Sequence, residues 1–294
     1  MEYLLIPLGC ALASLKVTVQ SKFSKNGTHT LSQNLFFTAI MFLTISLIFL
    51  PTLFDGGISS TTVFYAALVG GLSFLYQIFY VMALSLGRMT LTVIINNFGM
   101  LVPMIVSVVV VGDTLTPFIC IGAVLALVSL CLTVANKKGK KSAGVGEGAK
   151  WLILSLLVFL TNGFAATAQK MYTARAGADF QIFEFVCIAY MFASAFCFAA
   201  LAVSAPKEKR QGIKITDRKT VLLGACVGMA LGIFQCVNTL AISLIPGSIY
   251  YPVYNCGTSL MLALIGAVLF KERFTLRQYI GIAIGVIAIL LLCI

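Results

Sequence analysis

The feature that most constrains this chain is a series of long apolar runs with very few charges inside them. Each run holds about 20 residues, enough for a helix to cross roughly 30 Å of hydrocarbon. The runs are continuous and do not alternate apolar with polar residues, which favours helices over a barrel. The predicted segments are Tyr3–Gln20, Leu31–Phe54, Ser60–Leu86, Thr90–Val111, Pro117–Ala135, Trp151–Tyr172, Phe180–Ala205, Thr220–Ile245, Ser248–Phe270 and Leu276–Ile294. The sequence therefore predicts an all-α integral membrane protein with ten transmembrane helices.

The composition excludes most soluble functions. Apolar residues make up 60% of the 294 residues and charged residues only 10%, against roughly 25% charged in a soluble domain. Such a chain cannot cover a globule with a solvated surface, so a soluble enzyme or a nucleic-acid binder is not expected. The net charge of +11 comes from basic residues between the apolar runs, where membrane proteins concentrate Lys and Arg. The expected surroundings are a lipid bilayer, and nucleic acid is not an expected partner.

An internal repeat is the most informative pattern. Polar and glycine residues of the third and fourth segments recur 158 positions later, and further pairs recur at spacings of 159 and 154. The recurring pairs are Gly70 with Gly228, Gln77 with Gln235, Asn97 with Asn255, Asp113 with Glu272, and Lys16 with Lys170. Each copy holds five helices, an odd number, so the second copy must enter the membrane from the opposite side. This predicts two inverted five-helix repeats, as in many transporters.

The repeat also divides the chain into domains. We expect a first repeat at 1–135, a basic flexible linker at 136–150, and a second repeat at 151–294. A cleaved signal segment is the alternative for the N-terminus, because Ala11-Leu12-Ala13 and Leu8-Gly9-Cys10 resemble cleavage boxes. However, the region lacks a basic start, and cleavage would remove one member of the repeat.

Loop charges predict the orientation. The loops after the odd-numbered helices carry 17 Lys and Arg residues, whereas the loops on the other side carry only Arg175. Cytoplasmic loops are the basic ones. We therefore expect a multi-pass protein of the cell membrane with both termini on the extracytoplasmic side.

Motifs in both repeats carry a family resemblance. The second repeat has Pro246-Gly247-Ser248, followed after an apolar stretch by Lys271-Glu272-Arg273-Phe274-Thr275, and the first has Gly112-Asp113-Thr114-Leu115-Thr116. With these motifs the whole chain resembles the EamA type of the drug/metabolite transporter superfamily. The resemblance implies a transporter whose helices 3, 4, 8 and 9 line a central cavity.

Three charges fall inside the apolar segments, namely Lys16, Lys170 and Glu184. A charge at mid-helix costs roughly 2.5–3.5 kcal/mol on insertion scales, so each is a candidate functional residue. The two lysines would attract anionic or carboxylate-bearing solutes, or would pair alternately with Glu184. The alternative is that both lysines snorkel to the membrane interface.

Uncharged polar residues give a second candidate set for binding substrate. They recur at helical spacing on the third, fourth, eighth and ninth segments. The set comprises Gln77, Tyr80, Asn97, Gln235, Asn238, Tyr251 and Asn255. Its members would line a cavity near the midplane, or else form hydrogen bonds between helices worth about 0.6 kcal/mol each.

Other chemistry has little support in the sequence. The nine cysteines form no CxxC spacing and His29 is the single histidine, so we expect neither a metal nor a cofactor, and no enzyme. Glu184 is the only acidic residue well inside a span, which disfavours an exporter of cationic drugs. We expect a secondary transporter of a small polar or amphipathic, amino-acid-like metabolite that works by alternating access. A proton-coupled multidrug exporter and a channel-like or scaffold protein remain alternatives, and a homodimer is possible.

Overall fold

The computed structural model describes residues 4–25, 30–54, 56–85, 89–133, 145–177, 180–209, 217–270 and 275–292. These residues are almost entirely helical. The α-helices are α1 (Leu5–Lys25), α2 (Leu31–Phe49), α3 (Ser60–Ser85), α4 (Met89–Phe98), α5 (Leu101–Val106), α6 (Pro117–Thr133), α7 (Val145–Arg175), α8 (Ile182–Lys209), α9 (Arg218–Leu244), α10 (Gly247–Phe270) and α11 (Leu276–Leu292). A 3₁₀ turn, Leu50–Phe54, extends α2, and a π turn, Ser107–Val111, extends α5.

The ten predicted segments are confirmed, with two differences. The fourth segment is broken into α4 and α5 at Gly99 and Met100, where the Gly99 N–H donates to the Asn96 carbonyl at 2.9 Å. The sixth helix begins at Val145, inside the expected linker 136–150, because α7 continues for several residues beyond its apolar span. Linker residues 136–144 lie outside the described part of the chain.

The described helices have the length and hydropathy of membrane spans. Five of them are long and apolar enough to cross a bilayer: the helices at Leu31–Phe54, Ser60–Ala83, Gly148–Arg175, Ile182–Pro206 and Arg218–Leu244. Many large apolar side chains, such as Val109, Leu222 and Leu290, are more than half exposed. Exposed apolar side chains on this scale suit a surface that faces lipid rather than water.

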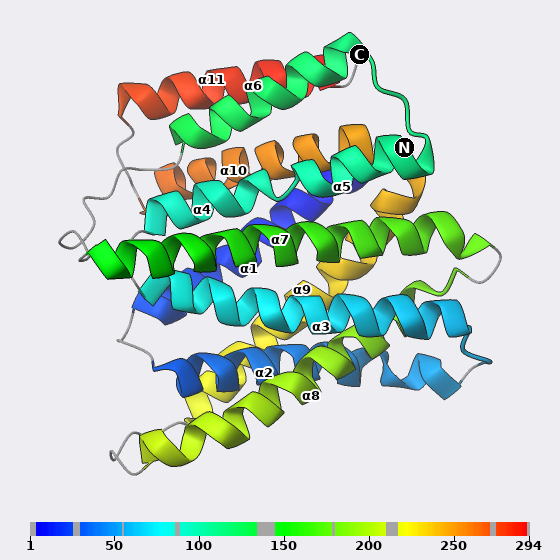
Figure 1. Cartoon of the computed structure of the whole chain (residues 1–294), viewed down its shortest axis with the longest axis vertical. Helices are drawn as coiled ribbons and strands as arrows, with labels where there is room; N and C mark the ends of the chain where they lie inside the picture. Colours follow the sequence, from blue (N-terminus) through cyan, green and yellow to red (C-terminus); the bar gives the residue numbers. More distant parts are fainter. Residues whose placement is uncertain are drawn as a thin grey trace.

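The helices form one bundle in which each repeat packs against the other. Helices α3 and α7 lie side by side, and so do α9 and α1, which are their equivalents in the opposite repeats. Helix α2 packs on its equivalent α8, and α6 packs on its equivalent α11 at one edge of the bundle (Figure 1). These reciprocal contacts are those of two inverted five-helix repeats.

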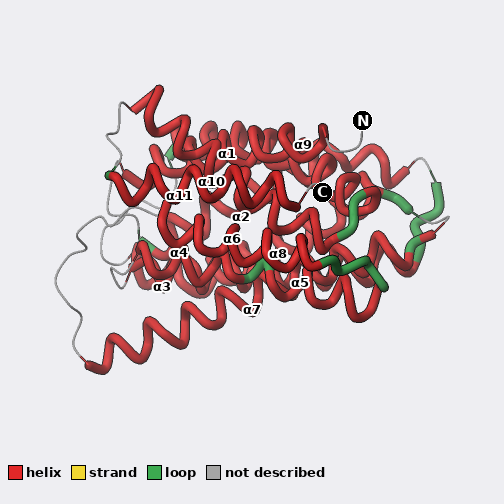
Figure 2. Tube along the Cα trace, turned by 90° about the horizontal axis from the view of Figure 1, so that it is seen from above, coloured by secondary structure: helices red, strands yellow, loops and turns green. Residues whose placement is uncertain are grey.

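Both chain termini lie at the same end of the bundle in both views (Figures 1 and 2). Residues 112–116, which join the fourth segment to α6, lie at this end, and so do the last turn of α7 and the start of α10. We call it the terminus end. By the loop charges of the sequence, it is the end predicted to face away from the cytoplasm.

Two equivalent glycines let the repeats approach closely. A Cβ at Gly70 of α3 would lie 2.2 Å from the Ala189 carbonyl oxygen of α8. A Cβ at Gly228 of α9 would lie 2.5 Å from the Met41 carbonyl oxygen of α2. These distances leave no room for a side chain, so the two glycines permit backbone-to-backbone contact between repeats.

Candidate functional site

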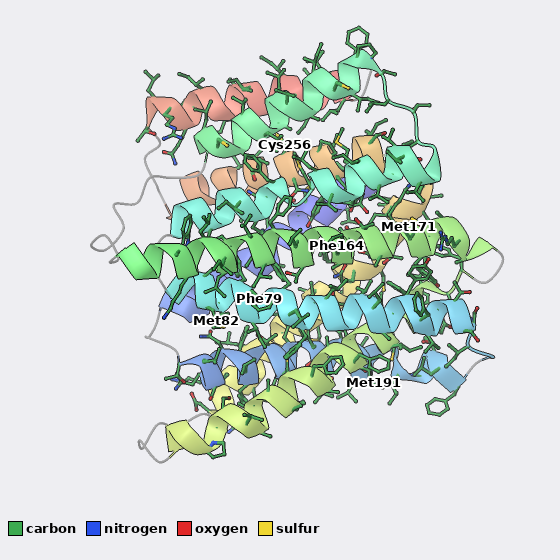
Figure 3. The ribbon with its side chains drawn as sticks, in the orientation of Figure 1. Phe79, Met82, Phe164, Met171, Met191 and Cys256 are labelled. Atoms are coloured by element: carbon green, nitrogen blue, oxygen red, sulfur yellow. The ribbon has the colours of Figure 1, made fainter. Side chains whose placement is uncertain are left out.

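Uncharged polar and aromatic side chains gather in the interior of the bundle. We call this set the aromatic–amide cluster, and it comprises Gln169, Tyr190, Gln235, Asn238, Tyr250 and Tyr254. They come from four helices of the second repeat: α7, α8, α9 and α10. Side chains fill much of the space between these helices (Figure 3). Polar groups placed here must bond to each other or to a solute, since hydrocarbon cannot satisfy them.

A chain of hydrogen bonds joins three of these helices. The Tyr250 hydroxyl donates to Asn238 Oδ1, and Asn238 Nδ2 donates to Gln169 Oε1 at 3.2 Å. Gln169 Nε2 then donates to Thr239 Oγ1 at 2.7 Å, and this hydroxyl donates to the Gln235 carbonyl at 2.8 Å. The network fixes the side-chain positions of α7, α9 and α10 relative to one another, because each donor has a specific acceptor.

Stacked rings form the aromatic part of the cluster. The Tyr250 and Tyr254 rings stack with centroids 5.7 Å apart and planes within 5°. Phe234 also stacks on Tyr254, with ring centroids 5.8 Å apart. In the first repeat, Tyr76 stacks on Tyr80 at 5.6 Å. Tyrosine rings thus occur on α3 of the first repeat and on α10 of the second, and each carries a polar hydroxyl on a large apolar ring.

Gln235 has a side-chain acceptor without a hydrogen-bond partner among the described residues. Its Nε2 donates to the Tyr190 hydroxyl, whereas its Oε1 is buried and has no hydrogen-bond partner among the described residues. An unpaired buried acceptor costs about 1–3 kcal/mol. An acceptor in this position is available to a donor that enters the cluster.

A buried ion pair lies toward the terminus end from this cluster. Lys170 Nζ is 3.5 Å from Asp113 Oδ2, and the two side chains are only 7% and 13% exposed. Lys170 follows Gln169 directly and precedes Met171, which lies toward the terminus end of α7 (Figure 3). Tyr251 of α10 lies near Asp113 and donates its hydroxyl hydrogen to the Ala166 carbonyl at 3.0 Å. Tyr251 thus connects the ion pair to the tyrosines of the cluster.

The end of α9 and the start of α10, which a short turn separates, hold this ion pair. Lys170 Nζ donates to the carbonyls of Ile242 and Ile245 at the C-terminal end of α9, at 3.3 and 3.4 Å. Asp113 Oδ2 accepts from the backbone N–H of Gly247 at the N-terminal end of α10, at 2.6 Å. Helix C-termini favour cations and helix N-termini favour anions, so each charge lies where the backbone stabilises it.

The residues around the pair leave no space for a larger side chain at position 247. Asp113 Oδ2 accepts a further hydrogen bond from the Ser107 hydroxyl. A Cβ at Gly247 would lie 2.4 Å from that Ser107 Oγ. The glycine of the Pro246-Gly247-Ser248 motif is thus required for the close approach of the α10 backbone to Asp113.

The structure brings only some of the sequence-predicted site residues together. Gln235, Asn238 and Tyr251 lie in or beside the cluster, and the first two form hydrogen bonds between helices. Asn255 Nδ2 donates to the Tyr251 carbonyl of its own helix at 2.9 Å. Tyr80 stacks on Tyr76 of its own helix.

Three other predicted residues take separate positions. Gln77 lies between α3 and α2, in a small pocket that Asn34 and Thr38 also line. Asn97 is half-buried beside the break between α4 and α5, and its carbonyl accepts from the Met100 N–H at 3.3 Å. Lys16 is part of α1, but its side chain lies outside the described part of the structure.

The expectation that Lys170 pairs with Glu184 is wrong. The carboxylate beside Lys170 is Asp113, while Glu184 lies half-buried in the first turn of α8. From the sequence, Asp113 was named only as a member of the repeat and of the family motif and was given no role in a site. The pairing arises because the chain folds 112–116 back over the break between α9 and α10.

Sequence reasoning also missed Gln169 and Tyr190 as cluster members. Gln169 was detectable, since it is an amide inside an apolar span directly beside Lys170. Tyr190 carried no such signal, because it has neither a charge nor a polar neighbour in the sequence. Asp113 had one signal, its acidic equivalent Glu272 in the second repeat, although that residue lies outside the described range.

Comparisons with known proteins agree with this architecture. The sequence model of the EamA-like transporter family matches residues 2–135 and again residues 149–294. Among solved structures, 28 chains match. One crystal structure, whose description names no function, has a TM-score of 0.75 over 100% of this chain and 98% of its own, at 14% identity. At that identity the likeness shows the fold alone. No curated protein matches the sequence.

The family match covers both halves of the chain and nearly all of the described helices. It agrees with the two inverted repeats and with the long apolar helices of the bundle. Members of this family are membrane transporters rather than enzymes. The chain is therefore a multi-pass membrane transporter and belongs to the EamA-like transporter family.

Proposed function

We propose that this transporter moves a small polar or amphipathic metabolite of the amino-acid type, and that it works by alternating access. The observation that carries the proposal is the aromatic–amide cluster, whose six side chains are all uncharged. Hydroxyls and amides can bond the polar groups of a solute, while the stacked tyrosine rings contact its apolar part. Phe42 of α2 packs on Tyr190 of the cluster with ring centroids 5.1 Å apart, so both halves of the bundle border this site.

The way the repeats pack supports alternating access as the mechanism. Each repeat contacts the other through equivalent helices, α3 with α7 and α9 with α1. Rocking one repeat against the other would expose the interface between them first to one side and then to the other. The unpaired Oε1 of Gln235 is buried, and movement of the repeats would let a donor of the solute reach it.

Reconstitution into proteoliposomes tests this function. Vesicles with the purified protein are loaded with each of a panel of unlabelled amino acids, and entry of the labelled compound is measured as counterflow. We expect saturable counterflow for at least one neutral amino acid, and none from protein-free vesicles. Uptake that never saturates and shows no counterflow would instead support the channel-like alternative.

The multidrug alternative has a specific test in the same vesicles. An exporter of lipophilic cations normally uses a carboxylate inside the membrane as a counter-charge. Asp113 is already paired with Lys170, which leaves the half-buried Glu184 among the described acids of the spans. If proton-driven cation transport occurs and Glu184→Gln abolishes it, the multidrug function is supported over metabolite transport.

We further propose that the protein lies in the cell membrane with both termini extracytoplasmic. Support comes from the 17 basic residues in the loops of one side, because positive loops remain in the cytoplasm. Epitope tags at either terminus should be digested by protease added to intact cells. Protection of both tags would show that the termini face the cytoplasm and that the proposed orientation is wrong.

A further inference from the structure

The ion pair of Lys170 and Asp113 joins the two repeats at one end of the bundle. Asp113 belongs to the first repeat, whereas Lys170, Ile242, Ile245 and Gly247 belong to the second. Every strong contact of this carboxylate outside its own segment therefore crosses the interface that alternating access would open.

A second bond crosses the same interface beside the pair. Ser248 Oγ donates to the Thr114 carbonyl at 3.0 Å, one residue along the chain from each of Gly247 and Asp113. Together the contacts fasten residues 113 and 114 to the break between α9 and α10. Because Tyr251 lies near Asp113, these contacts close the terminus end directly beside the aromatic–amide cluster.

A second set of hydrogen bonds between the repeats lies at the same end, farther from the cluster. The side chain of Gln181, which precedes α8, accepts from the Ser59 N–H at 3.1 Å and donates to the Gly57 carbonyl at 2.8 Å. Its Oε1 also accepts from the Thr62 hydroxyl at 3.2 Å. These neutral bonds are individually modest, whereas the ion pair is buried and is held by two helix ends. Among the described contacts at this end, the ion pair is the one that joins two opposite charges across the repeats.

We infer that Lys170 and Asp113 form a latch that closes the terminus end and separates whenever the central site opens to that side. This inference rests on the proposed alternating-access function. In the closed state, the latch satisfies both charges and the free backbone groups at the α9–α10 break. Opening must rehydrate all of these groups together, so the closed and open states are distinct. The charges in the sequence alone suggest a lysine that attracts solute, but the pairing with Asp113 gives Lys170 a role in the conformational change.

Cys10 is a native reporter for the opening. It is 3% exposed, and its thiol lies 3.6 Å from the Tyr254 carbonyl in the cluster. It shares a hydrophobic cluster with Ile242 and Ile245, whose carbonyls hold Lys170. A membrane-impermeant thiol reagent should therefore reach Cys10 from the terminus end only when the latch is open.

The test measures Cys10 labelling by peptide mass spectrometry in right-side-out and inside-out membrane vesicles without added solute. Asp113→Asn and Lys170→Met should each raise the labelling rate from the terminus-end side by about tenfold or more, because each variant shifts the population toward the open state. The double variant Asp113→Lys with Lys170→Asp should label more slowly than either single variant. Cys10→Ala identifies the reporter peptide.

A matched control removes a cross-repeat bond at the opposite end of the bundle. Ser32 Oγ donates to Ser204 Oγ at 2.9 Å, between α2 and α8. Ser32→Ala should leave Cys10 labelling from the terminus-end side unchanged. If Asp113→Asn and Lys170→Met remain monodisperse and label no faster than the wild type, or if Ser32→Ala labels as fast as they do, the latch is overturned.

A cross-link keeps the inference testable if the single variants do not fold. Cysteines at Thr114 and Ser248 replace the bond between these two residues with a disulfide that holds the end closed. In this double-cysteine variant, oxidation should lower the labelling of Cys10 from the terminus-end side about tenfold, and reduction should restore it. Unchanged labelling after complete cross-linking would overturn the latch. Since no solute is used, this outcome is independent of whether the protein transports amino acids.

Discussion

Lys170 and Asp113 form a buried ion pair that joins the two repeats, with 3.5 Å between Nζ and Oδ2. The ammonium caps the C-terminal carbonyls of α9 and the carboxylate accepts from the N-terminal N–H of α10. Asp113→Asn or Lys170→Met alone should destabilise the protein by about 3–5 kcal/mol, because each leaves an uncompensated buried charge. The combined variant should lose less than the sum of the two. Unfolding in detergent micelles measures this cycle, and strict additivity would show that the two charges do not interact.

Neighbouring glycines of α3 should respond very differently to the same substitution. Gly70→Ala places a methyl group 2.2 Å from the Ala189 carbonyl oxygen, whereas Gly71→Ala meets only Phe196 Cε2 at 3.8 Å. We expect Gly70→Ala to cost about 1–3 kcal/mol through overpacking. Gly71→Ala should stay within about 0.5 kcal/mol of the wild type. Melting temperatures of the two purified variants provide the comparison, and equal values would mean that α3 and α8 are less tightly packed than described.

The hydroxyl of Tyr250 should contribute to stability through its partner. Tyr250→Phe keeps the ring stacked on Tyr254 but leaves Asn238 Oδ1 buried without its donor. This change should cost about 1–3 kcal/mol, the usual penalty for a buried unsatisfied polar group. Tyr279→Phe serves as the control, because Tyr279 is 58% exposed. The same unfolding assay should show almost no effect there, and a neutral Tyr250→Phe would contradict the network.

Variants of Gln235 and Tyr190 should show whether Gln235 binds solute or only supports the structure. Gln235→Met removes the free Oε1 acceptor, so KM for the solute found in the counterflow screen should rise about three- to tenfold, the effect of one lost hydrogen bond. Tyr190→Phe removes only the hydroxyl that Gln235 Nε2 contacts and retains the acceptor. It should raise KM less than Gln235→Met does, because the Tyr190 hydroxyl is already bonded to Gln235 Nε2. Equal KM changes in both variants would assign Gln235 a structural role.

The sequence anticipated the fold more fully than the site. Segment limits such as Leu31–Phe54 agree with α2 and its 3₁₀ extension, because the length of an apolar run is a local property. The break at Gly99 and the start of α7 at Val145 were not predicted. Hydropathy measures only whether a segment is apolar, so it detects neither a turn inside a span nor a helix that continues into a polar region.

The candidate site, too, could be predicted only in part from the sequence. Gln235 and Asn238 share a helix face, and the repeat marked Gln235 through its equivalent Gln77. Gln77 lies against α2 and Gln235 bonds Tyr190 of α8, the helix equivalent to α2, so the repeat places both amides alike, yet only Gln235 belongs to the cluster. The repeat relates backbone positions, and the neighbouring helices have diverged in the side chains that they offer.

By itself the sequence determined that this protein is a ten-span helical transporter built from two inverted repeats. These properties follow from run length, the odd helix number per repeat and the order of the recurring residues. Only the tertiary structure decided that Lys170 meets Asp113 rather than Glu184. The choice of partner depends on how residues 112–116 cross the break between α9 and α10. A buried charge then binds where exposed helix ends can satisfy it, and no local pattern encodes that position.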